Sequence, residues 1–131
     1  MNLRDRGSAV LIENNKVALI KRIKKGAAYY VFPGGGIEKG ETPEEATKRE
    51  AYEELGIDME VKECIAEIEY NGKQFFYLGD IVGGNFGTGQ GEELSDERKG
   101  TYIPVWVEIH ELLSIEVKPK EVAEKIYFLF K

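Results

Sequence analysis

Apolar residues near the start of the chain fall into two short runs that predict a β-hairpin. The centre of Gly7 to Glu13 is almost continuously apolar, which predicts a strand that is buried on both faces. Asn14-Asn15 suits a tight turn, and Lys16 to Arg22 is expected to return as the partner strand. Arg22 to Gly26 is then expected to form a basic loop, because three of its residues are cations and it ends in glycine.

The next segments lead from a strand, through a glycine turn, into a helix. Pro33 and the three glycines after it predict a turn whose backbone can approach another group closely. Thr42 can act as the N-cap of a helix, with Glu45 completing a capping box, and Pro43 suits the first turn. Gly56 suits the left-handed residue that ends a helix. The helix is therefore expected to run from Pro43 to Leu55.

The second half of the chain predicts a longer hairpin, a glycine-rich connection and a C-terminal helix. The expected elements are a strand at Asp58 to Tyr70, a turn at Asn71-Gly72, a strand at Lys73 to Val82, a flexible loop at Gly83 to Gly91, an edge or bulged strand at Thr101 to Val107, a short helix at Glu108 to Leu113 and a helix at Lys120 to Phe130. Val122, Ile126, Leu129 and Phe130 form an apolar stripe along the last helix.

Composition narrows the class of protein. A chain of 131 residues with 42% apolar residues predicts one domain, residues 1–131. The net charge of −6 argues against nonspecific binding to nucleic acid. Cys64 is the only cysteine of the 131 residues, so they cannot form a disulfide among themselves. It is expected to be a small buried residue within a strand. With no signal peptide and no apolar run of membrane-spanning length, a cytoplasmic protein without membrane contact is expected.

Three glutamates near the end of the predicted helix form an unfavourable cluster. Glu50, Glu53 and Glu54 are three and four residues apart, so they share one face and repel by roughly 0.2–0.5 kcal/mol per pair. They also lie at the end of the helix dipole that prefers cations, and Lys48 and Arg49 offset only part of this cost. A solvated acidic face is the simplest explanation. The alternative is a site for a hard divalent cation, Mg²⁺ or Mn²⁺.

The spacing around this cluster favours the metal site. It reads Gly35-x5-Glu41-x7-Arg49-Glu50-x2-Glu53-Glu54-x-Gly56-Ile57. The pattern resembles the signature box of the Nudix hydrolases, and in particular the MutT-like members. One position departs from it, since Ala51 stands where the family usually has a bulkier aliphatic residue. The resemblance implies an α/β fold, namely a Nudix-type α/β/α sandwich with a mixed central β-sheet, in which the box forms a loop-helix-loop.

The resemblance also implies an activity. Nudix hydrolases cleave a phosphoanhydride bond in a nucleoside diphosphate-linked substrate with the help of Mg²⁺ or Mn²⁺, and a nucleoside triphosphate is one candidate here. By position in the box, Glu53 and Glu54 are the expected principal metal ligands, Glu50 a ligand or general base, and Glu41 a weaker ligand. The metal site is also expected to include the Gly34 carbonyl, while Arg49 would orient a neighbouring carboxylate. The alternative function is a regulatory module that binds a nucleotide without hydrolysing it.

Residues outside the box complete the expected site. The family often uses one more glutamate from a later loop, for which Glu93 is the first candidate and Glu92 and Glu97 are alternatives. Further expected substrate contacts are Arg22, Tyr30, Phe32 and Gly35; Tyr30 and Phe32 alternate and can share a face that lines a pocket, although core packing explains either one equally well. His110 is expected to be an ordinary surface residue. The expected partner is a small nucleotide, and a homodimer is one option for the oligomeric state.

Overall fold

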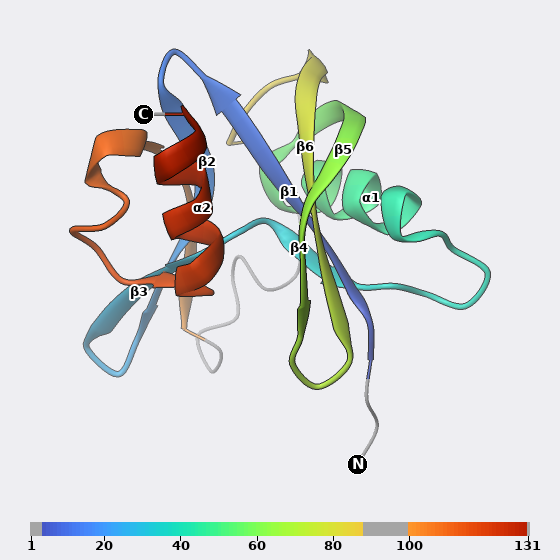
Figure 1. Cartoon of the computed structure of the whole chain (residues 1–131), viewed down its shortest axis with the longest axis horizontal. Coiled ribbons are helices and arrows are strands. Elements are labelled where there is room, and N and C mark those ends of the chain that lie inside the picture. The colour runs from blue at the N-terminus through green and yellow to red at the C-terminus, as the bar shows by residue number, and fades with distance from the viewer. Residues whose placement is uncertain (1–3, 88–99, 131) are drawn as a thin grey trace.

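The structure is a computed structural model that describes residues 4–87 and 100–130, and in this part of the chain eight strands and two α-helices are arranged in layers (Figure 1). The elements are β1 (Arg6–Glu13), β2 (Lys16–Lys24), β3 (Ala27–Val31), β4 (Gly34–Gly36), α1 (Pro43–Leu55), β5 (Ile57–Glu69), β6 (Lys73–Gly84), β7 (Thr101–Glu108), a 3₁₀ helix (Ile109–Glu111), β8 (Val117–Lys118) and α2 (Lys120–Phe130). None of the described helices is both long enough and apolar enough to span a bilayer.

The strands form one mixed sheet. Its main path runs β5-β6-β1-β2-β3-β8, while β4 pairs with β1 and β7 pairs with β2. The β1–β6 and β3–β8 pairs are parallel, and the other pairs are antiparallel. The long crossover from β1 to β6 leaves room for the segment that contains α1, which packs against β1 and β5.

Alternating residues of β1 and β2 supply two separate cores. Ala9 and Leu11 pack with Ala51 and Leu55 of α1, whereas Val10 packs on the other side of the sheet in a cluster that includes α2. All five of these side chains are fully buried. The two helices lie on opposite sides of this part of the sheet (Figure 1). The predicted α/β/α sandwich with a mixed sheet is therefore confirmed.

Helix α1 begins and ends where its capping residues predict. The Thr42 hydroxyl accepts a hydrogen bond from the Glu45 backbone N–H at 3.1 Å, and the Glu45 carboxylate accepts one from the Thr42 N–H at 2.9 Å. At the other end, Gly56 has a φ of 78° and donates its N–H to the Tyr52 carbonyl. Both ends are set by contacts a few residues apart, so the orientation of the acidic face is fixed locally.

Two segments that were expected to be loops or turns are strands. Arg22 to Lys24 belong to β2, where all three pair with β3 and Arg22 and Ile23 also pair with β7, so the basic loop shrinks to a turn at Lys25 and Gly26. The glycines 34–36 form β4 rather than a turn, because their backbone pairs with residues 6–8 of β1. Gly83 and Gly84 likewise end β6, and the part of the expected glycine-rich loop from residue 88 onward lies outside the described residues.

Three details of the sequence interpretation were wrong. Cys64 lies in a strand as expected, but its side chain is exposed, because β5 changes register against β6 on both sides of it. Leu129 is 57% exposed, although it was placed in the apolar stripe of the last helix. The expected short helix at Glu108 to Leu113 is a single 3₁₀ turn, Ile109–Glu111.

The capping of α1 can be tested by removing its N-cap. We expect Thr42→Ala to lower the free energy of unfolding by about 0.5–2 kcal/mol, because the N–H of Glu45 loses its acceptor. Thermal unfolding followed by circular dichroism measures this change. Thr42→Ser keeps the hydroxyl and serves as the control. Equal losses for the two variants would show that the methyl group, and not the cap, carries the effect.

Candidate active site

A cavity of about 660 Å³ lies between the acidic face of α1 and the first two strands. Glu50, Glu53 and Glu54 of the helix line one side of it, together with the three glycines of β4. Arg22 also lines it. The fold thus brings most of the box residues and the predicted Arg22 to one hollow whose lining carries both carboxylates and guanidinium groups.

The glycines of β4 allow the backbone to approach the glutamates. The Gly34 N–H donates a hydrogen bond of 2.6 Å to Glu54 Oε2. Beside it, Gly35 has no room for a Cβ atom, because the Glu50 carboxylate occupies that position. Any larger residue at Gly35 would displace Glu50 from the cavity wall.

Arg49 connects the carboxylates to one another. Its Nη1 donates to Glu50 Oε2 at 2.9 Å and to Glu53 Oε2 at 3.0 Å. Its Nε and Nη2 form a two-pronged contact with Glu41 at 2.8 and 3.1 Å, and Nη2 also donates to the Gly36 carbonyl at 3.0 Å. One guanidinium therefore offsets the repulsion of three carboxylates and ties the helix to the loop before it and to β4.

The pKa values reflect this arrangement. The hydrogen bonds from Arg49, followed by one from the Glu38 backbone N–H, lower the pKa of Glu41 to about 2. The bonds to Glu41 raise the pKa of Arg49 above its already high value, with further contributions from Glu50 and Glu53. Both oxygens of Glu41 accept from Arg49, and Glu41 is not among the residues that line the cavity. Its role as a weaker metal ligand stays a prediction, and its contacts favour a role in orienting Arg49.

Arg22 lies between two tyrosines from neighbouring strands. The strand register places Tyr102 of β7 and Tyr29 of β3 directly across from it. Its guanidinium carbon lies 4.1 Å from the centre of the Tyr102 ring and 5.6 Å from that of Tyr29, which are cation–π distances. These contacts orient a permanent positive charge at the edge of the cavity.

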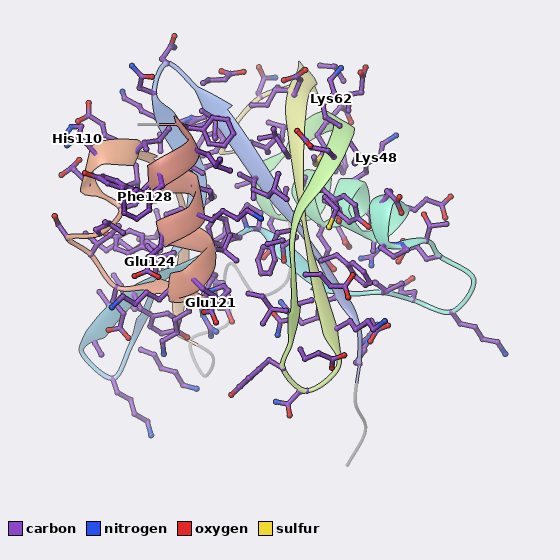
Figure 2. All side chains as sticks on the ribbon, viewed as in Figure 1. Lys48, Lys62, His110, Glu121, Glu124 and Phe128 are labelled. Atoms are coloured by element: carbon purple, nitrogen blue, oxygen red, sulfur yellow. The ribbon has the colours of Figure 1, made fainter. Side chains whose placement is uncertain are left out.

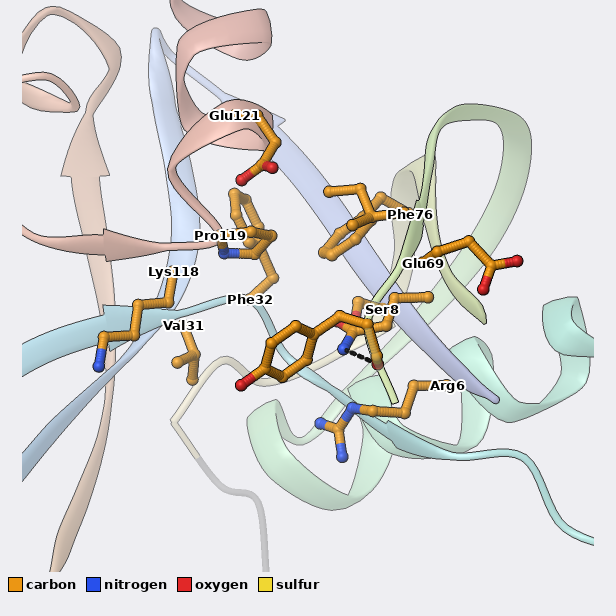
Figure 3. A pocket seen from close by; sticks show the side chains of 12 residues that line it. Arg6, Ser8, Val31, Phe32, Glu69, Phe76, Lys118, Pro119 and Glu121 are labelled. Carbon is orange, nitrogen blue, oxygen red and sulfur yellow. Dashed lines mark hydrogen bonds between the residues drawn. The ribbon is translucent and has the colours of Figure 1, made fainter. Parts of the chain in front are cut away.

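A second cavity of about 590 Å³ adjoins the first, and the two share Arg6, Val31 and Phe32 (Figure 3). Its floor is apolar and aromatic, with the rings of Phe32 and Phe76 in an edge-to-face contact at 5.6 Å. Glu121, from the first turn of α2, projects its carboxylate toward this hollow (Figure 3). The pair of cavities can hold a ligand that is anionic at one end and flat and apolar at the other.

The other predicted residues are distributed as follows. Phe32 lines both cavities, whereas Tyr30 packs against the core on the α2 side, although the two share a face as predicted. Glu92, Glu93 and Glu97 lie outside the described residues.

Among the lining residues of the first cavity that the sequence interpretation missed are Arg4, Arg6 and Tyr102. The sequence did contain a signal for Arg4 and Arg6: they are two closely spaced cations at the start of the first strand of an acidic protein.

His110 lies on the surface, far from α1 in the view of Figure 2. Its Nε2 is 2.5 Å from Glu108 Oε2, and the ligand atoms of Glu108, His110 and Glu111 lie within 4.8 Å of one another. All three side chains are exposed, and exposed acidic groups of this kind are common without a metal.

Comparison with known proteins identifies the family of the chain. The profile of the NUDIX domain matches residues 3–129. The chain is 42% identical over 60 residues to the 8-oxo-dGTP diphosphatase of Escherichia coli, covering 44% of this chain and 46% of that protein. It is 40% identical over 57 residues to the RNA pyrophosphohydrolase of Psychromonas ingrahamii, covering 44% and 32%. The matched region thus spans about a third to a half of the length of these relatives.

The fold has close structural counterparts. A NUDIX hydrolase from Nitrosomonas europaea superposes with a TM-score of 0.74 at 22% identity, over 96% of this chain and 88% of that one.

The Glu41–Arg49 contact makes stability depend on pH. Because the pKa of Glu41 is about 2 in the folded protein and about 4.5 ordinarily, its stabilising effect is complete above pH 4.5 and lost as the pH falls toward 2. Glu41→Gln should therefore lower the thermal midpoint most near neutral pH, and its difference from the unchanged protein should shrink between about pH 4.5 and 2. Glu63→Gln, at an exposed position of β5, is the control. A difference that stays constant over this range would contradict the assignment.

Proposed function

The chain belongs to the NUDIX family, and we propose that residues 1–131 form one domain that hydrolyses a phosphoanhydride bond in a nucleoside diphosphate-linked substrate. One observation carries the proposal: Glu50, Glu53 and Glu54 line one cavity together with the β4 backbone and Arg22. Hydrolysis of such a bond needs positive charge on the phosphate oxygens and a correctly placed water. Both requirements can be met in this cavity.

The residues of the cavity wall fit a divalent cation. Each of the three carboxylates accepts a hydrogen bond that orients it, from Arg49 for Glu50 and Glu53 and from the Gly34 N–H for Glu54. A carboxylate has about four acceptor positions, so an orienting hydrogen bond and a metal ion can occupy different positions of the same group. Hard oxygen donors suit Mg²⁺ or Mn²⁺. A bound ion would supply positive charge to the phosphate oxygens.

The proposed roles follow from these contacts. Glu53 and Glu54 are the principal ligands, the Gly34 carbonyl adds a neutral oxygen, and Glu50 is a further ligand or the general base. Arg49 positions the carboxylates through its hydrogen bonds. Glu93 remains the alternative base.

The second cavity supports a nucleotide as the substrate. Its aromatic floor, with Phe32 and Phe76, can contact a nucleobase, and it adjoins the metal-binding wall through Val31 and Phe32. Relatives of the chain are named for 8-oxo-dGTP, which is a nucleotide, and for RNA, which is a chain of nucleotides. A nucleoside triphosphate is the first candidate. Release of phosphate or pyrophosphate from a panel of nucleotides, with Mg²⁺, Mn²⁺ or EDTA, tests the proposal; no metal-dependent release from any of them would leave the regulatory module as the better function.

The metal site can be tested by changing one ligand. We expect Glu53→Gln to lower kcat by at least about a hundredfold, because a lost ligand removes several kcal/mol of charge stabilisation. Binding of Mn²⁺, followed by electron paramagnetic resonance, should weaken in parallel. The thermal midpoint in EDTA should change little, since the Glu53–Arg49 pair is half-exposed and such helical pairs contribute roughly 0.3–0.5 kcal/mol.

The matched control for this variant is Glu44→Gln, an exposed glutamate in the first turn of the same helix. It removes the same charge from α1 at a position that does not line the cavity. If Glu53→Gln retained activity within tenfold of the control, the assignment of Glu53 would be wrong.

Arg22 can be tested through the split between KM and kcat. A contact made equally in the bound substrate and in the transition state raises KM when it is lost and leaves kcat nearly unchanged. We therefore expect Arg22→Ala to raise KM by about tenfold, as for a lost hydrogen bond to a charged group. Arg22→Lys keeps the charge but loses the planar contact with Tyr102, so its KM should be intermediate. An unchanged KM for Arg22→Ala on every substrate hydrolysed would remove Arg22 from the site.

A further inference from the structure

A third hollow, of about 430 Å³, lies next to the two cavities already described. Its lining consists of Arg4, Arg6, Gly36, Tyr70, Asn71 and Gln74. These residues offer two cations, two amides and a phenol, and the lining includes no carboxylate. Glutamates line both of the other cavities, in a protein with a net charge of −6. The composition of the third hollow is that of an anion-binding site.

Packing and backbone contacts hold Arg4 in place. Its N–H donates to the Asn71 carbonyl at 3.1 Å, and the Cα of Gly72 lies so close to the Arg4 backbone that a Cβ atom could not fit there. The guanidinium of Arg4 occupies the position that a side chain at Gly36 would need.

No carboxylate within the described residues forms an ion pair with either arginine. Arg6 makes a long contact of 3.4 Å to the Gly34 carbonyl, and no salt bridge of Arg4 is found there. Both arginines thus line the hollow without an ion pair to a carboxylate of this part of the chain, and the charge of Arg4 reaches Glu41 only as a minor contribution to its lowered pKa.

The hollow is continuous with the site. Arg4 and Gly36 also line the metal-binding cavity, and Tyr70 and Gln74 also line the aromatic cavity. Arg6 lines all three. A ligand that occupies the two cavities can therefore extend one of its groups into this hollow.

We propose that this hollow is a subsite for one additional phosphate group of the substrate, with Arg4 and Arg6 as its receptors. The inference rests on the proposed function, since it assumes that a nucleotide occupies the adjoining cavities. Arginine matches a phosphate through parallel N–H donors, and the side-chain amides of Asn71 and Gln74 add neutral donors at the wall. The shared chemistry is a phosphate monoester or anhydride, either at the far end of a 5′ polyphosphate or on the 3′ oxygen of the sugar.

The test measures binding in the absence of metal, so that it does not depend on hydrolysis. Calorimetric titrations in EDTA compare guanosine 5′-triphosphate with two probes that carry one more phosphate, guanosine 5′-tetraphosphate and the 3′-phosphate of guanosine 5′-triphosphate. One of the two probes should bind about tenfold more tightly than the triphosphate, as expected for a charged hydrogen-bonded contact. The probe that gains affinity identifies the position of the additional phosphate.

Variants locate the effect. Arg4→Ala should bring the affinity ratio of the longer probe to the triphosphate close to one, and Arg4→Lys should retain part of it. Lys48→Ala removes the same charge from an exposed position of α1 that lines none of the three cavities, and should leave the ratio unchanged. The proposal is overturned if neither probe binds more tightly than the triphosphate, or if Arg4→Ala and Lys48→Ala keep the same ratio. The affinity ratios are measured in EDTA and do not depend on hydrolysis. A failure of metal-dependent hydrolysis would therefore contradict the proposed function without changing these ratios.

Discussion

The site depends on the hydrogen bonds of one side chain, Arg49. Glu50, Glu53 and Glu41 would repel one another across the end of α1 and the loop before it, and the helix dipole adds to the cost. The guanidinium of Arg49 donates to all three and to the Gly36 carbonyl. A lysine could neutralise part of the charge, but it could not make the paired contact with Glu41 while also reaching the other groups. The planar fork of donors is what fixes loop, helix and strand relative to one another.

Around Arg49, the cavity combines both signs of charge. Helix α1 contributes three carboxylates and Arg49 itself, and further arginines come from the start of the chain and from β2. In the proposed function, this combination lets an acidic protein bind a polyanion, with a divalent ion held by the carboxylates and phosphate contacted by the arginines. The aromatic cavity between β6 and α2 is then left to recognise the uncharged part of the ligand. Each cavity has a composition that suits a different part of a nucleotide.

The parts of the fold that could be predicted are those set by short-range contacts. Helix α1 was predicted to the residue because Thr42, Glu45 and Gly56 act within a few positions of one another. The burial of β1 on both faces followed from its own composition. The exposed Cys64 and the strand at Arg22 to Lys24 could not be predicted, because they depend on pairing with β6, β3 and β7. Register between strands distant in sequence decides such features, and one residue of slip reverses the face of every side chain.

In the candidate site, too, some features follow from local sequence and others from strand pairing, and β4 has examples of both. In the sequence, Gly34, Gly35 and Gly36 are three equivalent glycines. In the structure, each has a separate role: Gly34 donates its N–H to Glu54, Gly35 makes room for Glu50, and Gly36 makes room for Arg4. The first two roles concern residues of the box, whose spacing could be interpreted directly. The third concerns an arginine more than thirty residues away, brought there when residues 6–8 of β1 pair with β4. The role of Gly36 therefore depends on strand pairing within the sheet. The same pairing brings Arg4 and Arg6 close to the acidic helix.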